Sequence, residues 1–307
     1  MMKIELEKIA TETRNESTAN IDKMTTIEIL KAINDEDKKV AYAVEKELPN
    51  IEKAVEVIYQ KLVAGGRLIY CGAGTSGRLG VLDAVECPPT FGVSPDFVKA
   101  IMAGGPSAFV KAVEGAEDNK TLGASDLIAA GFTESDVLVG IAASGRTPYV
   151  IGCMEYAKKI GAPVISLSCS LHSEIEQYAD IAISPWSGPE VIAGSTRMKS
   201  GTSQKMILNM ISTAVMIKLG KVYGNLMVDV QATNEKLIER TKSIVCTATG
   251  VDLNTAIATL EQCEYSAKHA ILMILANVNY DQSKNLLLKH NNNIAHALEF
   301  LNNSKAI

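Results

Sequence analysis

Apolar residues recur at three- and four-residue spacing through the first 64 residues of the chain. This spacing is typical of amphipathic helices. Thr25 or Thr26 is a candidate N-cap, and Gly65 and Gly66 form a candidate stop. We therefore expect a helical lead-in over residues 1–64.

Five short apolar runs follow the lead-in, and helical patterns separate them. Short strands that alternate with helices predict a parallel sheet with covered faces. We therefore expect an α/β fold whose parallel-sheet domain spans residues 65–235. The five expected strands are residues 67–71, 98–104, 136–144, 162–168 and 180–184.

The last third of the chain has helical patterns. An apolar stripe predicts a long helix over residues 200–219, with Gly220 just past its end. Strand patterns disappear from residue 230 onward, and a break falls at residues 247–254. We expect a small all-helical C-terminal domain over residues 240–307.

Composition narrows the function classes. Of the 307 residues, 47% are hydrophobic and 21% charged, and the net charge of -5 leaves no large basic surface for nucleic acid. The N-terminal residues 1–17 lack the apolar core of a secretory signal. The longest apolar stretches are shorter than the roughly 20 residues of a membrane span. We expect a cytoplasmic protein with no nucleic-acid or membrane partner.

Cysteine and histidine spacing argues against a metal site. The six cysteines form no C-x-x-C pair, and the four histidines show no metal-ligand spacing. Reduced and mostly buried thiols are the simplest interpretation. We expect no metal and no cofactor, and we expect the chemistry to depend on carboxylates.

The loop CGAGTSGRLG, residues 71–80, has the composition of an anion-binding turn. Its glycines let backbone N–H groups approach an anion, Thr75 and Ser76 add hydroxyl donors, and a helix N-terminus follows. We expect Gly74, Thr75, Ser76 and Gly77 to bind phosphate.

Gly72, Gly74 and Gly77 also fit the dinucleotide-binding pattern G-x-G-x-x-G. A dinucleotide site has one further requirement. A dinucleotide site needs an acidic residue at the end of the second strand to bind the ribose. That strand ends in residues 101–107, which contain no acid, and Asp96 and Glu86 lie elsewhere. The nucleotide interpretation is therefore disfavoured.

The third strand ends in a second loop of similar chemistry, AASGRTPY, residues 142–149. Two such loops from neighbouring strands can converge on one phosphate monoester. A third segment, residues 186–205, is rich in glycine and hydroxyl groups and is a candidate to close the site. The expected binding residues are Ser144, Gly145, Arg146 and Thr147 from the second loop, and Glu190, Ser195, Arg197 and Lys199 from the third segment.

Several long motifs together resemble one family, the N-acetylmuramic acid 6-phosphate etherases of the sugar isomerase (SIS) fold group. The resemblance covers residues 8–235 closely and the helical tail less so. Val85 departs from the family's motif, in which a smaller residue is expected at this position. The motifs are GAGTSGRLGVLDAVECPPTFG, VEGAEDN, AASGRTPYV, GPEVIAGSTRMKSGTSQKM and TETRNESTANIDKMTTIEILKAINDEDKKVA.

The resemblance implies cleavage of the lactyl ether at C3 of the sugar, giving N-acetylglucosamine 6-phosphate and D-lactate. In the open-chain sugar the C2 proton lies α to the aldehyde, so a base can remove it while an acid protonates the departing oxygen. Carried over from the family, Glu86 is the acid and Glu117 the base. Which glutamate does which stays open, and Glu114 competes with Glu117.

The lactyl carboxylate calls for a cation, for which an arginine is well suited. The candidates are Arg78, Arg146, Arg197 and Lys199. The resemblance also implies a homodimer in which one subunit can complete the other's site.

Two alternatives remain open. One is a non-catalytic sugar-phosphate sensor, because the family resembles the glucokinase regulatory protein, although that protein is much longer and carries two such domains. The other is an aldose–ketose isomerase, and the sequence GPE at residues 188–190 is compatible with it.

Overall fold

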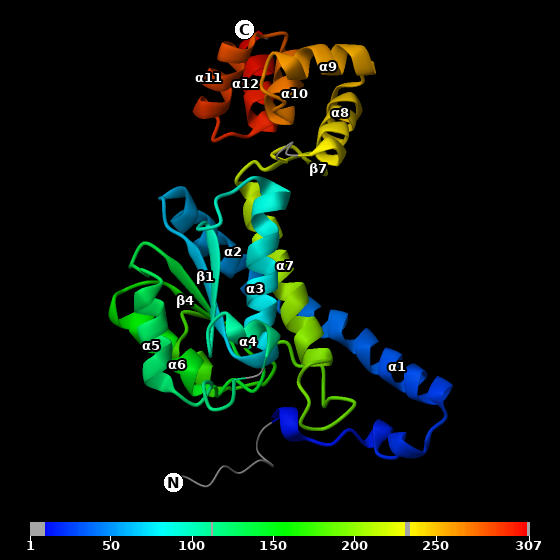
Figure 1. Cartoon of the computed structure of the whole chain (residues 1–307), viewed down its shortest axis with the longest axis vertical. Coiled ribbons are helices and arrows are strands. Elements are labelled where there is room, and N and C mark those ends of the chain that lie inside the picture. Colours follow the sequence, from blue (N-terminus) through cyan, green and yellow to red (C-terminus); the bar gives the residue numbers. More distant parts are fainter. Residues whose placement is uncertain (1–9, 112, 231–233, 306–307) are drawn as a thin grey trace. The chain divides into compact units, whose positions relative to one another are not determined.

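The computed structural model describes residues 10–111, 113–230 and 234–305 (Figure 1). Within them the chain forms two compact units. The first unit comprises residues 1–85 and 95–212, and the second comprises residues 86–94 and 213–307. The part of the expected lead-in at residues 1–9 lies outside the described residues.

The lead-in is helical, as its periodicity predicts. Short 3-10 turns precede two long helices, α1 (Thr26–Glu45) and α2 (Leu48–Val63). The Glu28 side chain accepts hydrogen bonds from the backbone nitrogen and the hydroxyl of Thr25, which fixes the start of α1. The 3-10 turns are Ala10–Glu12, Glu16–Thr18 and Ile21–Lys23.

The first unit is built around one parallel sheet of five strands in the order β2-β1-β3-β4-β5. This confirms the predicted fold class. β1 and β3 are buried along their whole length, as expected for central strands covered by helices. The strands are β1 (Leu68–Gly72), β2 (Val98–Met102), β3 (Val137–Ile141), β4 (Val164–Leu167) and β5 (Ile181–Ile183).

Strand order places two loops at the functional edge of the sheet. β1 pairs with both β2 and β3, and Gly72, the last residue of β1, aligns with Ile141, the last residue of β3. The chain turns to opposite sides of β1 to reach its two neighbours, so this is the switch point where ligands of open parallel sheets bind. The loops after β1 and β3 therefore leave the sheet side by side.

Helices connect the strands and cover the sheet. α6 packs against β1, β3 and β4, and α2 packs against β3 and β5. α5 and α6 lie unusually close, because a Cβ on Gly123 or Gly152 would collide with the backbone of the other helix. The helices after β1 are α3 (Gly74–Phe91), α4 (Ser107–Val110), α5 (Lys120–Ala129), α6 (Pro148–Lys159), the 3-10 helix η5 (Glu174–Tyr178) and α7 (Lys199–Lys218).

The second unit is mostly helical and has its own apolar core. The predicted break at residues 247–254 is present, because Gly250 ends α8 in the left-handed conformation and Asp252 caps α9. A small hairpin, β6 (Val222–Tyr223) and β7 (Leu226–Met227), was not predicted. The helices are α8 (Glu235–Thr249), α9 (Leu253–Glu261), α10 (Ala267–Ala276), α11 (Tyr280–Lys289) and α12 (Ile294–Lys305).

The boundaries between the two compact units fall inside α3, in the loop between α3 and β2, and inside α7. The domain bounds expected at residues 64, 235 and 240 therefore stay a prediction. Among the described residues no single helix is long and apolar enough to cross a membrane. The bent pair α8 and α9 meets the length and composition requirements only when taken together.

Candidate active site

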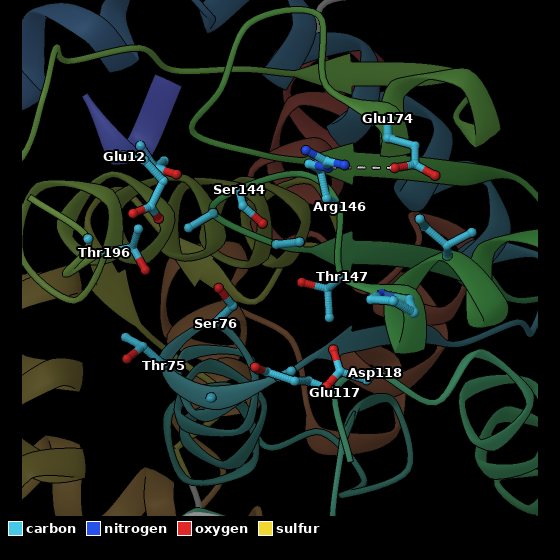
Figure 2. A pocket seen from close by; sticks show the side chains of 18 of the residues that line it. Glu12, Thr75, Ser76, Glu117, Asp118, Ser144, Arg146, Thr147, Glu174 and Thr196 are labelled. Carbon is cyan, nitrogen blue, oxygen red and sulfur yellow. Dashed lines mark ion pairs between the residues drawn. The ribbon is translucent and has the colours of Figure 1, made fainter. Parts of the chain in front are cut away.

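A cavity of about 650 Å³ opens at the carboxyl edge of the sheet in the first unit (Figure 2). Both glycine-rich loops contribute to it, as the sequence predicts. Segments that lie far apart in the chain complete the lining. Its polar side chains are Thr11, Glu12, Thr75, Ser76, Glu117, Asp118, Lys120, Ser144, Arg146, Thr147, Glu174 and Thr196.

The loop after β1 is shaped by close backbone contact. A Cβ on Gly72 would lie 2.7 Å from the backbone nitrogen of Gly77, and a Cβ on Gly77 would lie 2.8 Å from the Cβ of Met102. These two glycines therefore allow a tight turn from strand to helix. Gly74 and Thr75 begin α3 at the cavity wall, where the helix N-terminus favours an anion.

Ser76 is held in place by a residue that the sequence analysis did not identify. Its hydroxyl donates to Oε1 of Gln204 in α7 over 3.0 Å, and both side chains are buried. The Nε2 atom of Gln204 has no hydrogen-bond partner among the described residues. Gln204 thus fixes the orientation of Ser76 at the cavity wall, a long-range contact that no local motif reveals.

The loop after β3 brings a second helix N-terminus to the same cavity. Ser144, Arg146 and Thr147 line it, and Thr147 is the N-cap of α6. Gly145 does not line the cavity; it has a φ of +68°, and a Cβ there would collide with Ser173. Two helix N-termini therefore face one space, which favours a phosphate group.

The lead-in forms part of the cavity wall, which its sequence pattern did not predict. Thr11 and Glu12 line the cavity, and Thr11 is only 2% exposed with no partner for its hydroxyl among the described residues. A Cβ on Gly194 would lie 3.3 Å from Oε2 of Glu12. Figure 2 shows Glu12 beside Thr196. The helical pattern of the lead-in gave no indication that its first turn reaches the site.

Glu117 lies in the cavity beside the start of α3 (Figure 2). Its backbone carbonyl accepts a hydrogen bond from the nitrogen of Tyr149 over 3.0 Å, which ties its segment to α6. A smaller cavity of about 170 Å³ adjoins this region, and both Glu117 and Glu114 line it. Glu114 does not line the larger cavity, so the two competing glutamates occupy different positions.

Glu86 lies elsewhere on the chain. It is exposed on α3, twelve residues after Gly74, and it does not line the cavity. The helical rise of 1.5 Å per residue puts it about 18 Å along the helix axis from Gly74. The family resemblance implies that Glu86 and Glu117 act together, but the structure does not bring them together in one chain's cavity.

Two of the four expected binding residues in the third segment, Glu190 and Lys199, have structural roles. Both carboxylate oxygens of Glu190 accept backbone N–H groups at the start of α7, from Lys199 at 3.0 Å and Ser200 at 2.9 Å. The Lys199 ammonium is buried and pairs with Glu36 at 2.7 Å. Neither side chain lines the cavity, because each is already bonded within the protein. Ser195 also does not line it.

The candidate cations also differ in whether they face the cavity. Arg78 donates to the carbonyls of Ala108 and Phe109, and Arg197 is exposed and lines neither cavity. Arg146 lines the large cavity with its Nε 3.9 Å from Glu174. Lys120 also lines it, but its ammonium is 2.6 Å from Glu155. Arg146 is therefore the predicted cation that faces the cavity.

The sheet topology and the paired helix N-termini define a class of protein, the SIS domain. Residues 50–158 match the family described as glucokinase regulatory protein N-terminal SIS domain, and residues 120–214 match the SIS domain family. A phosphoheptose isomerase from Francisella tularensis shares the fold, with a TM-score of 0.51 at 19% identity. That match covers 63% of this chain and 100% of the isomerase.

Full-length relatives define the particular family. The chain is 56% identical to the N-acetylmuramic acid 6-phosphate etherase of Clostridium beijerinckii, over 99% of this chain and 100% of the relative. It is 58% identical to the etherase of Photorhabdus laumondii, over 94% of this chain and 96% of the relative. The chain belongs to the N-acetylmuramic acid 6-phosphate etherase family, which confirms the resemblance seen in its motifs.

Proposed function

We propose that this chain cleaves the lactyl ether of N-acetylmuramic acid 6-phosphate. The observation that carries the proposal is the cavity, in which two helix N-termini and Glu117 face one space in a chain of this family. The helix N-termini suit the 6-phosphate, and a carboxylate suits proton transfer at the far end of an open-chain sugar.

The reaction proceeds as an elimination followed by an addition. Glu117 removes the C2 proton, the C3–O bond breaks, and its electron pair leaves with the lactyl oxygen, which takes up a proton. Water then adds its hydroxyl at C3 and a proton at C2 of the unsaturated aldehyde. The products are N-acetylglucosamine 6-phosphate and D-lactate, and no oxidant or cofactor enters the balance.

The first experiment measures D-lactate release from N-acetylmuramic acid 6-phosphate by the purified chain. We expect catalytic turnover with equal amounts of lactate and amino-sugar phosphate. Binding without turnover would instead support a sensor, and ketose formation would support an isomerase. The isomerase is disfavoured in advance, because both carboxylate oxygens of Glu190 are occupied by the start of α7.

Arg146 is proposed to bind the lactyl carboxylate. Arg146→Met should raise KM for the muramyl substrate about tenfold or more, because a charge-assisted contact contributes about 1.5–3 kcal/mol. Binding of the product sugar phosphate, which lacks the lactyl group, should change little. A matched substitution, Arg197→Met, removes an exposed cation outside the cavity and should leave KM near that of the wild type. Equal weakening of substrate and product would assign Arg146 to the phosphate instead.

The acid is proposed to be Glu86 from a second copy of the chain. This fits the position of Glu86, which is exposed and lies about 18 Å along α3 from its own phosphate loop. A cytoplasmic homodimer would then place each Glu86 at the other subunit's cavity.

Mixing two inactive variants tests this arrangement. Glu86→Gln and Glu117→Gln, unfolded and refolded together, should regain about a quarter of wild-type activity, because half of randomly formed dimers carry one intact site. Each variant refolded alone should stay inactive. If both glutamates act within one chain, the mixture will remain inactive as well.

A further inference from the structure

A separate polar cavity lies within the second unit and shares no lining residue with the two cavities described above. Its volume is about 530 Å³. Residues from the end of the β6–β7 hairpin and from the first turn of α10 face it, and all its lining residues belong to the second unit. The charged residues that line it are Lys221, Asp229, Glu264 and Lys268.

Two lysines share a single carboxylate at this cavity. The Oδ2 atom of Asp229 lies 2.7 Å from the Nζ of Lys268 and 2.9 Å from the Nζ of Lys221. The Lys268 side chain is 5% exposed and that of Asp229 is 16% exposed. The cluster therefore holds one positive charge in excess. The Lys221 side chain is 22% exposed, so solvent compensates its charge only in part. A structural ion pair with the buried Lys268 would need no second lysine.

The position of Lys268 on its helix adds to the excess of positive charge in the cluster. Ser266 is the N-cap of α10, so Lys268 lies in the first turn, at the positive end of the helix dipole. Acidic residues are the ones normally favoured there. Burial and the neighbouring Lys221 both lower the pKa of Lys268, although Asp229 opposes them. The helix and the two ammonium groups together attract negative charge.

Glu264 also lines the cavity, so its four charged side chains sum to zero formal charge. The excess positive charge is confined to the cluster of Lys221, Asp229 and Lys268. Glu264 is exposed, and its carboxylate makes no described ion pair with either lysine. Burial lowers the pKa of His269, which favours its neutral form, and its Nδ1 is 2.9 Å from the Ser283 hydroxyl. His269 therefore adds hydrogen-bonding capacity without changing the charge.

We propose that this cavity binds a small oxyanion, with a carboxylate or phosphate oxygen held between the ammonium groups of Lys221 and Lys268. The site is separate from the catalytic cavity and does not depend on the reaction that takes place there. Two sources can supply such an anion, the lactate that the reaction releases and inorganic phosphate from the surrounding solution.

The test uses the full chain labelled with ¹⁵N-lysine, titrated separately with D-lactate and with inorganic phosphate at constant ionic strength in chloride. The amide signals of Lys221 and Lys268, each assigned by its Lys→Met variant, should shift and saturate with at least one anion. The anion that saturates at the lower concentration identifies the source. Failure of both anions to shift either signal saturably would overturn the proposal.

Three variants separate a binding site from a purely structural cluster. Lys268→Met should abolish the saturable shift of Lys221, and Lys221→Met should do the same for Lys268, which guards against one variant failing to fold. Asp229→Asn removes the internal competitor, so it should tighten binding several-fold. The matched control Lys236→Met removes an exposed lysine of α8 and should change nothing. Unchanged affinity in Asp229→Asn would overturn the proposal.

Discussion

Replacing Glu117 by glutamine should lower kcat for lactate release by about 10²–10⁴-fold, the range for loss of a general acid or base. The glutamine keeps the size of the side chain but does not accept the C2 proton. Because Glu117 is exposed at the cavity wall, the substitution should change the free energy of unfolding by less than about 0.5 kcal/mol. Turnover is measured as lactate release at saturating substrate.

A proton-exchange measurement distinguishes the base from the acid. In D₂O, a base at C2 is required for deuterium to enter that position, so Glu117→Gln should abolish deuterium incorporation into recovered substrate and product. An acid variant, Glu86→Gln, should slow lactate departure while exchange at C2 continues. If Glu117→Gln still exchanges the C2 proton at the wild-type rate, Glu117 is not the base.

Glu114→Gln is the matched control for this prediction. It removes a second glutamate from the same segment, three residues earlier, which lines only the smaller cavity. We expect turnover close to that of the wild type. Loss of turnover in Glu114→Gln with normal turnover in Glu117→Gln would reverse the assignment.

The sheet and the two glycine-rich loops at its carboxyl edge could be predicted from the sequence because their signals are local. Each buried strand appears as a short apolar run. A glycine needed for a tight turn, such as Gly77 against Gly72, belongs to the same stretch as the hydroxyl groups it positions. The hairpin at residues 222–227 was missed because each of its strands has only two residues and shows no periodicity. Its turn, Gly224-Asn225, was the only available indication.

The other walls of the candidate site depend on contacts between distant segments, which local patterns do not encode. Thr11 reaches the cavity from the lead-in, and Gln204 reaches Ser76 from α7 across 128 positions of sequence. The same limit explains why Glu190 and Lys199 were expected to bind a ligand although their roles are structural. Their motif is rich in charge and glycine, as binding loops are, but their partners are backbone groups of α7 and the carboxylate of Glu36.

The Glu36–Lys199 pair joins α1 to the start of α7, and breaking it should strongly destabilise the first unit. The two side chains are 5% and 1% exposed, with 2.7 Å between Oε2 and Nζ. Glu36→Gln should lower the free energy of unfolding by about 3–5 kcal/mol, because it removes the carboxylate that pairs directly with the buried Lys199 ammonium. Chemical denaturation monitored by circular dichroism measures the loss.

Two comparisons show that burial, and not charge alone, causes the effect. Asp35→Asn breaks a neighbouring pair with Lys38 whose side chains are 67% and 62% exposed, and it should cost less than about 1 kcal/mol. The double variant Glu36→Gln with Lys199→Met removes both buried charges and should recover much of the stability lost in Glu36→Gln. If the double variant is as unstable as the sum of the two single variants, the ion pair is not the cause.

The same pair should make stability depend on pH. Burial alone would raise the pKa of Glu36, but hydrogen bonds from Lys199 and Lys39 outweigh it and lower that pKa to about 2. The folded-state pKa lies below the unfolded value, so the stabilisation is complete above about pH 4.5 and is lost as the pH falls toward 2. Asp37, whose pKa is raised by burial and by Glu190, contributes a dependence of opposite sign. Asp37 is present in both proteins, and Glu36 is the smallest of the causes that raise its pKa. The wild type should therefore lose more stability than Glu36→Gln between pH 4.5 and 2. Equal losses in that window would show that Glu36 carries no depressed pKa.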